Sequence, residues 1–484
     1  MAAQAYDVVV IGGGAAGCVV AARLAEHDSR SVLLLEAGPD RRGDVPPELQ
    51  DGWTIDREQF DWGYESEPHA GGEVKPVRRK RLLGGTSWLT RFTPRGSPAD
   101  YNGWAGLGLT GWAWEDVLPY FVKLENDVDF GDRPWHGDHG PIPSSRQLDE
   151  EPTDVGAAAI DALAAAGFPW VDDHNEPGAV GVGRMPMNVL GGRRVTTVDA
   201  YLPLGGTPPN LGIRSEARVD RVVFDRGRAV GVRLADGTSV EAGHVVLCAG
   251  VYGSPAILLR SGVGPEGLLA DLPGVGANLV DHPSVYVDFG YQGSGRAAPA
   301  LHTIATFHSS GRSSAETPDL MFWLADPTEE DTEFGAEVVL LRPHSRGSVR
   351  LRSHDPHDPP LIELPNLDDR SDLERLAEGY RRALDLATQP VLRRLCAGPE
   401  PKEPEDLEAL IRTELFSVPH TVGTCAMGSV VDASGGVFDI ERLSVRASLG
   451  EATPRDLGKL RDGRQPVAAG GAGRDRQGAA VVHH

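Results

Sequence analysis

Residues 6–17 read Tyr-Asp-Val-Val-Val-Ile-Gly-Gly-Gly-Ala-Ala-Gly, and this stretch decides the fold. Its first half, 6–11, is a short apolar run rich in β-branched residues, which is typical of a buried parallel strand. Residues 18–26 follow with apolar side chains at helical spacing, and 31–35 form a second apolar run that ends at Glu36. Strand, glycine-rich turn, helix and strand in this order predict a βαβ unit.

The turn of this unit carries the dinucleotide-binding fingerprint Gly-x-Gly-x-x-Gly. Gly12 permits the tight turn, Gly14 lets the backbone approach a pyrophosphate, and Gly17 allows the helix to pack closely on the strand. The helix N-terminus at Ala15 and Ala16 offers free N–H groups to phosphates. The alternative is a glycine-rich turn with a purely structural role, but the complete order of elements favours dinucleotide binding.

The acidic residue at the end of the second strand narrows the choice of dinucleotide. Glu36, followed by Ala37, stands where a side chain accepts hydrogen bonds from ribose hydroxyls. A carboxylate at this place repels a 2′-phosphate. Glu36 therefore favours FAD or NAD over NADP.

Composition excludes several other classes of protein. The 484 residues are 40% hydrophobic and 24% charged, as in an ordinary globular chain. A net charge of −23 argues against nucleic-acid binding, which requires clustered Lys and Arg. No apolar run reaches about 18 residues, so we expect no integral membrane segment. A first strand beginning near Tyr6 leaves no room for a signal peptide.

The four cysteines are far apart in the sequence, and none forms a Cys-x-x-Cys pair. This spacing argues against a zinc ribbon or a thioredoxin-type motif. Their even number would permit disulfides, but their density is too low for a secreted scaffold. We therefore predict a cytoplasmic protein without a metal site.

The spacing of apolar residues also predicts helices and strands in the rest of the chain. The periodicity predicts helices, strands and a hairpin turn in the following segments: a helix at 157–166, paired strands within 213–241 with a turn at Asp236-Gly237, a buried strand at 244–249, antiparallel strands at 338–342 and 347–352, and a helix at 371–388 with Ser371 as its N-cap. From about residue 450 the chain is rich in Gly, Ala, Arg and Asp without apolar periodicity, which predicts a disordered tail.

A second candidate motif is His420-Thr421-Val422-Gly423-Thr424. A His beside a Gly-Thr turn can present its imidazole to a cleft and act as a general base at neutral pH. An isolated His more often makes a structural hydrogen bond, so this motif alone leaves both roles open.

Taken together, ordered blocks of the chain resemble the glucose–methanol–choline (GMC) oxidoreductases, a family of FAD enzymes that act on alcohols. The resemblance covers about residues 5–448 and rests on the fingerprint and on these further blocks: 36–39 (Glu-Ala-Gly-Pro), 83–87 (Leu-Gly-Gly-Thr-Ser), 249–255 (Ala-Gly-Val-Tyr-Gly-Ser-Pro), 274–279 (Gly-Val-Gly-Ala-Asn-Leu), 281–283 (Asp-His-Pro), 345–349 (Ser-Arg-Gly-Ser-Val) and 419–424. Each block alone is weak evidence for the family, but all of them in this order are highly specific for it.

The resemblance implies roles for particular residues. The turn Gly84-Gly85-Thr86-Ser87 is expected to line the flavin and the pyrophosphate, and Val219 to meet the adenine through its backbone. His420 matches the family's active-site His, which takes the hydroxyl proton of the alcohol while hydride moves to flavin N5. Thr90 stands where the family usually has Asn near the flavin. No His occurs in this loop, so we expect FAD to be bound non-covalently.

The chain also departs from the family pattern at its C-terminal end. Arg446, in Val445-Arg446-Ala447-Ser448, replaces an Asp of the family near the isoalloxazine. The family's last block, which carries a second catalytic His or Asn and a closing helix, has no counterpart; His483 and His484 match no motif position. A shifted reading frame or a diverged terminus is the hypothesis that we draw from this change.

The expected architecture is α/β, with a Rossmann-like FAD-binding domain and a substrate domain built on an antiparallel sheet with helices. Residues 1–155, 190–284 and 416–449 are assigned to the FAD-binding domain. Residues 156–189 and 285–415 are assigned to the substrate domain, and 450–484 to the tail. The active site is expected where the two domains meet.

Four functions remain open at this point. The first is oxidation of a primary or secondary alcohol, with oxygen or a quinone-like carrier as electron acceptor. The second is a flavin-binding but catalytically impaired protein, because the terminal block is missing. The third is a lyase of the hydroxynitrile-cleaving kind known in the family. A nicotinamide-dependent enzyme is a distant fourth.

Overall fold

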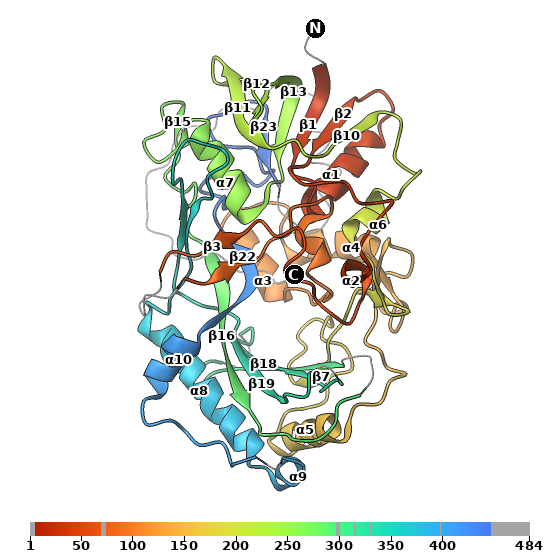
Figure 1. The fold of residues 1–484 in the computed structure, drawn as a ribbon, viewed down its shortest axis with the longest axis vertical. Coiled ribbons are helices and arrows are strands. Elements are labelled where there is room, and N and C mark those ends of the chain that lie inside the picture. Colours follow the sequence, from red (N-terminus) through yellow and green to blue (C-terminus); the bar gives the residue numbers. More distant parts are fainter. Residues whose placement is uncertain are drawn as a thin grey trace.

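The computed structural model describes residues 5–68, 74–296, 301–313, 316–329, 331–396 and 398–446. The predicted disordered tail, 450–484, lies outside the described residues. Two layers built on separate sheets are stacked along the long axis of the molecule (Figure 1).

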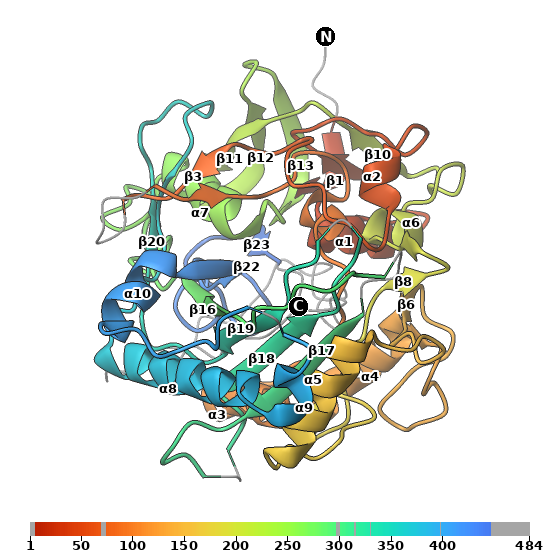
Figure 2. The same ribbon diagram turned by 60° about the horizontal axis from the view of Figure 1, so that its bottom comes forward.

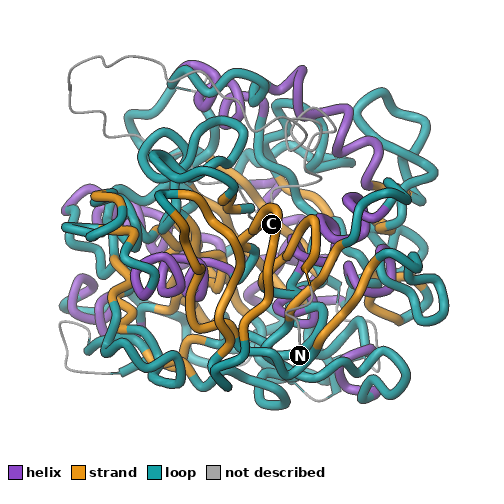
Figure 3. Tube along the Cα trace, turned by 90° about the horizontal axis from the view of Figure 1, so that it is seen from above, coloured by secondary structure: helices purple, strands orange, loops and turns teal. Residues whose placement is uncertain are grey.

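The upper layer is a seven-stranded sheet that contains the predicted βαβ unit. Its strands run in the order β10 (Leu211–Arg214), β2 (Val32–Leu35), β1 (Ala5–Ile11), β13 (Ser239–Leu247), β12 (Arg228–Leu234) and β11 (Val219–Asp225), and β23 (Leu443–Val445) also pairs with β13. β1 is parallel to both β2 and β13, and helix α1 (Ala15–Ala25) connects β1 to β2. Seen from above, these strands lie side by side at the centre (Figure 3).

The parallel strands β1 and β2 consist largely of buried aliphatic residues, which suits their place inside the sheet. All four residues of β2 and the last four of β1 are buried, as expected for strands covered on both faces. Asp236-Gly237 forms the predicted turn, between β12 and β13. The predicted pairing within 213–241 is wrong for its first residues, since Ile213 lies in β10 and pairs with β2 at the other side of the sheet.

The lower layer is a six-stranded antiparallel sheet. Its strands run in the order β22 (Phe416–Val422), β16 (Val280–Asp288), β19 (Gly335–Leu340), β18 (Leu320–Ala325), β17 (His302–Phe307) and β7 (Val182–Arg184). Helices α8 (Arg370–Ala387) and α5 (Asp154–Ala165) run along one face of this sheet (Figure 2). Alternate residues of its strands, such as Val285 and Phe322, form one hydrophobic core with these helices.

One local expectation in this layer is wrong, and another is confirmed with different strand partners. Helix α8 is capped by Asp369, whose side chain accepts the Ser371 N–H at 2.9 Å, so Ser371 is not the N-cap. The segments at 338–342 and 347–352 both contribute antiparallel strands, as predicted, but not to one pair. The first belongs to β19 of the six-stranded sheet, and the second to β20 (Ser348–Arg350), which pairs with β21 (Leu361–Glu363).

The remaining elements are short and connect or flank the two layers. They are α2 (Pro47–Gln50), β3 (Tyr64–Glu65), β4 (Pro76–Val77), the 3₁₀ turn η1 (Gly85–Trp88), α3 (Pro98–Gly106), α4 (Trp114–Leu124), β5 (Glu125–Asp127), β6 (Ile142–Ser144), β8 (Val189–Leu190), β9 (Arg193–Arg194), α6 (Thr197–Tyr201), α7 (Gly250–Arg260), β14 (Val263–Gly264), β15 (Ala270–Asp271), α9 (Pro390–Arg393) and α10 (Leu407–Glu414). Among the described residues, no helix has the length and apolar character needed to cross a bilayer.

Candidate functional site

A cavity of about 1760 Å³ is lined by residues of both layers, including the glycine-rich turn after β1 and the end of β22. Most of the residues singled out from the sequence line it: Gly12, Gly14, Ala15, Ala16, Glu36, Ala37, Gly85, Thr86, Ser87, Thr90, Val219 and His420. Gly17 and Gly84 are not among the lining residues. The cavity therefore brings together residues that are more than 400 positions apart in the sequence.

The three fingerprint glycines have distinct environments. Gly12 has φ +95°, and a Cβ there would lie 2.5 Å from the carbonyl oxygen of Cys248. A Cβ on Gly17 would lie 1.8 Å from the carbonyl oxygen of Gly12, so the helix can pack on the turn only without a side chain. Gly14 faces open space and lines the cavity. This arrangement fits a pyrophosphate that approaches the backbone at Gly14.

Glu36 is anchored by both of its carboxylate oxygens. The N–H of Gly13 donates to Oε2 at 2.7 Å, and the N–H of Gly38 donates to Oε1 at 2.7 Å. Burial raises the pKa of Glu36, although these N–H groups favour the ionised form. The carboxylate still borders the cavity, so its remaining lone pairs can accept ribose hydroxyls.

The turn after β4 is fixed against the fingerprint by direct backbone contact. The N–H of Gly84 donates to the carbonyl of Gly13 at 2.7 Å, and a Cβ on Gly85 would lie 2.8 Å from Gly14 Cα. The two glycine-rich turns thus form one continuous wall. Residues 86 and 87 follow in η1, and Thr90 lies just beyond it on the same wall.

His420 lies near the end of β22, opposite β16. The register of these two strands shifts between Val280 and His282. Such irregularities, or β-bulges, often change the direction of side chains beside active sites. The Nδ1 atoms of His420 and His282 are 3.4 Å apart, and the ring planes are nearly perpendicular, at 86°. The sequence block Asp281-His282, to which the resemblance gives no role, thus contacts His420 directly.

Asp281 is a buried acid that holds this corner. Its Oδ1 accepts the backbone N–H of His282 at 2.8 Å and that of His420 at 3.0 Å. Its Oδ2 accepts the hydroxyl of Ser417. Burial raises the pKa of Asp281 to about 7, against the opposing effect of these hydrogen bonds and of the Arg79 charge.

Arg79 contacts residues next to His420 and in helix α7, which flanks the upper layer. Its guanidinium donates to the hydroxyl of Thr421 and lies over the ring of Tyr252, 5.1 Å from the centroid. The Tyr252 hydroxyl is 3.0 Å from that of Thr421. The sequence carries no signal for Arg79 and includes Tyr252 only within the block 249–255, because only the fold brings both side chains to Thr421, the residue after His420.

Arg446 directly follows β23, at the carboxyl edge of the parallel strands. Its N–H donates to the carbonyl of Leu247 at 2.9 Å, and the residue lines the cavity. Its charge opposes the effect of burial on Cys248, whose thiol nevertheless has a pKa raised to about 12. The arginine expected to replace an Asp of the resembled family therefore borders the same cavity as the fingerprint turn.

All four cysteines are free thiols, so none of the disulfides that their even number permitted is formed. Burial raises the pKa of Cys18 and Cys425 to about 12. These thiols remain protonated at neutral pH and are poor nucleophiles.

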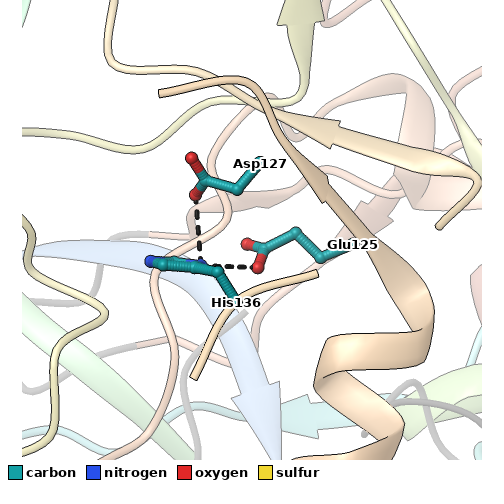
Figure 4. A group of neighbouring side chains, drawn as sticks. All are labelled: Glu125, Asp127 and His136. Atoms are coloured by element: carbon teal, nitrogen blue, oxygen red, sulfur yellow. Dashed lines mark hydrogen bonds and ion pairs between the residues drawn. The ribbon is translucent and has the colours of Figure 1, made fainter. Parts of the chain in front are cut away.

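A cluster of charged residues lies beside the cavity, at β5. The imidazole of His136 sits between Glu125 and Asp127, with Nδ1 at 2.7 Å and 3.2 Å from their carboxylates (Figure 4). Its Nε2 is 2.8 Å from Asp173. Burial opposes protonation, but the hydrogen bonds to Asp173 and Glu125 outweigh it and raise the pKa of His136.

The geometry of a Glu, an Asp and a His at contact distance is also that of a metal site. Here both imidazole nitrogens already face carboxylates, and Arg146 bridges Asp127 and Asp173 at 2.7 Å each. Arg95 pairs with Glu125. The acids of this cluster thus face arginines and a histidine whose protonated form they favour, so we interpret the cluster as a buried ion network.

Comparison with known proteins decides the family. The sequence-family models for the two parts of GMC oxidoreductases both match the chain. The N-terminal model matches residues 6–284, and the C-terminal model matches residues 343–447. The chain belongs to the GMC oxidoreductase family. The resemblance seen in the sequence is thereby confirmed, and with it the class of FAD-dependent oxidoreductases.

Two curated relatives illustrate the range of this family. The chain is 34% identical to 5-(hydroxymethyl)furfural oxidase of Methylovorus sp. over 495 residues, which cover 91% of this chain and 93% of the relative. It is 33% identical to oxygen-dependent choline dehydrogenase of Escherichia coli O157:H7 over 508 residues, covering 91% and 89%.

A solved structure supports the fold. Pyridoxine 4-oxidase from Mesorbium loti superposes with a TM-score of 0.82 at 28% identity, covering 94% of this chain and 97% of that one. The expected α/β architecture, an FAD-binding domain joined to an antiparallel sheet with helices, is confirmed by this likeness and by the two sheets.

Proposed function

We propose that this GMC oxidoreductase binds FAD non-covalently and oxidises a primary or secondary alcohol, with His420 as general base. The observation that carries the proposal is the single cavity that joins the fingerprint turn, Glu36 and the 84–87 turn to His420. The domain boundaries stated above belong to the same proposal, because they place this cavity between the two units.

The dinucleotide would be held by groups that the chain already orients. The backbone at Gly14 and the N-terminus of α1 face the place proposed for the pyrophosphate. Glu36 would accept the ribose hydroxyls, and Val219 would border the adenine. FAD, once bound, supplies a two-electron acceptor for the hydride that leaves the alcohol carbon.

His420 would remove the hydroxyl proton of the alcohol at one of its ring nitrogens. An alkoxide releases hydride more readily than an alcohol does, so proton removal and hydride loss together give the carbonyl product. The proton stays on His420, and the electron pair leaves with the hydride. A base of this kind contributes about 10²–10⁴-fold to the rate.

The substrate is proposed to be a small alcohol, and oxygen or a quinone-like carrier the electron acceptor. Oxygen is favoured, since the names of the relatives described above are those of oxidases and of an oxygen-dependent dehydrogenase. A catalytically impaired flavoprotein is the second candidate, and Arg446 at the cavity favours it.

The visible absorption spectrum of the purified chain, followed by anaerobic addition of alcohols, tests these candidates. Flavin bands near one equivalent, released by denaturation and bleached by an alcohol, are the expected result. Loss of bleaching in His420→Gln, with flavin content unchanged, would assign the base. The exposed His139→Gln serves as the matched control. Bound flavin that no alcohol bleaches supports the impaired protein, and a chain that added FAD cannot load contradicts both candidates.

A further inference from the structure

The contact between His420 and His282 constrains the protonation of both rings. Their Nδ1 atoms are 3.4 Å apart, so one nitrogen must donate and the other accept. Two imidazolium groups at this distance repel each other, which disfavours protonation of both rings. The charged groups at this corner are Asp281, against the backbone of both residues, and Arg79.

The partner residue, His282, is buried and its backbone is held in place. His282 is 1% exposed, in the pairing of β16 with β22, and its N–H donates to Asp281. The same carboxylate oxygen accepts the N–H of His420, so both backbones are fixed to one atom. A base that must meet a substrate in one orientation gains from such a support.

We propose that His282 and Asp281 are positioning residues for His420. The Nδ1 of His282 accepts the Nδ1–H of His420, which leaves the lone pair of His420 on Nε2. Asp281 fixes the backbone of both histidines, so that this Nε2 keeps its orientation. The catalytic consequence rests on the proposed function, in which Nε2 of His420 takes the proton of the alcohol.

The tautomer of His420 can be measured spectroscopically, without any substrate being oxidised. The test is ¹⁵N NMR of the flavin-loaded chain labelled at histidine, with the His420 signals identified by their loss in His420→Gln. We expect neutral His420 to show a protonated Nδ1 and an unprotonated Nε2. A proton on Nε2 in the unsubstituted chain would overturn the proposal.

Two variants sharpen this test. His282→Leu removes the acceptor, so the protonated Nδ1 form should lose its preference; His282→Asn keeps an oxygen near the place of Nδ1 and should restore it. Flavin reduction by alcohol should fall about 10- to 100-fold in the Leu variant and recover in part in the Asn variant. His139→Gln, whose ring is exposed, should change neither readout.

The outcomes separate this proposal from the proposed function. An unchanged His420 tautomer in His282→Leu contradicts the positioning role, even if alcohols are oxidised. The expected tautomers in a chain that oxidises no alcohol contradict the proposed function alone. Should the Leu variant not fold, the unsubstituted chain and the Asn variant still decide the tautomer.

Discussion

The effect of single residues at the site depends on the space and the polarity of their surroundings. Gly17 permits contact between α1 and the fingerprint turn because a methyl group would overlap the carbonyl of Gly12. Asp281 places a carboxyl group in a buried position, and its three hydrogen bonds only partly offset the cost of ionising it there. Both features have consequences for stability that can be measured.

Gly17→Ala is expected to destabilise the chain by about 1–3 kcal/mol, the usual cost of overpacking, and to weaken FAD binding. Gly103→Ala is the matched control, since Gly103 also lies within a helix but a Cβ there would meet nothing within 4 Å. The control should gain about 0.5–1 kcal/mol from helix propensity. Urea midpoints and flavin content measure both variants. Equal effects of the two substitutions would contradict the packing argument.

Asp281→Asn is expected to flatten the dependence of unfolding free energy on pH. The carboxyl has a pKa of about 7 in the folded chain, above the ordinary value of 3.8 that it regains on unfolding. Its stabilising contribution is therefore complete below the unfolded pKa and is lost as pH rises through the folded pKa, at up to about 1.4 kcal/mol per pH unit.

This prediction is checked by urea denaturation at several pH values between these two pKa values. The unsubstituted chain should lose stability relative to Asp281→Asn as the pH rises. Asp385→Asn, an exposed acid on α8, is the control and should follow the unsubstituted chain. A constant difference between chain and variant would show that Asp281 is ionised throughout.

Secondary-structure elements meet beside the cavity through the buried ion network. Arg146, just after β6, binds Asp127 of β5 and Asp173 in a loop. All three side chains are fully buried. A buried charge that loses its partner is strongly unfavourable, whereas an exposed pair contributes little.

Arg146→Met should cost about 3–5 kcal/mol, because it leaves two buried carboxylates without their guanidinium. Arg370→Met is the control, since that side chain is 63% exposed and pairs with Glu374 and Glu408. The control should cost at most about 1 kcal/mol. Urea midpoints of the two variants compare them directly. If Arg146→Met were as mild as the control, a bound cation or water would have to compensate the acids.

Residues of both layers line the cavity, so a dinucleotide that binds there stabilises the folded chain. FAD at a hundred times its dissociation constant should add about 2.7 kcal/mol to the unfolding free energy. Riboflavin, which lacks the pyrophosphate and adenine, should add much less at the same concentration. Urea denaturation with each ligand measures this. Equal effects of FAD and riboflavin would contradict the role of the fingerprint.

The half of the cavity proposed for the dinucleotide could be predicted from the sequence because its residues are close in the chain. Gly12, Gly17 and Glu36 lie in one βαβ unit, whose pattern is local. The corner at His420 could be assigned only by resemblance. His282 and His420 are 138 positions apart, and their contact depends on the pairing of β16 with β22.

Small errors have the same origin. The N-cap of α8 was placed at Ser371 because Ser and Asp are both good caps, and only the backbone shows that Asp369 accepts the hydrogen bond. Segments 338–342 and 347–352 were both recognised as strands, but strand partners depend on the arrangement of the whole sheet.

By itself, the sequence determined the βαβ unit, the dinucleotide fingerprint and the family. Patterns of apolar residues, turn glycines and a strand-end acid act over short distances along the chain, so they remain legible without the fold. Only the tertiary structure decided that Asp281 and His282 contact His420 and that Arg79 donates to the adjacent Thr421. It also decided that Glu125, Asp127 and His136 form an ion network. These contacts join distant segments, and their register is fixed by sheet pairing and core packing rather than by local sequence.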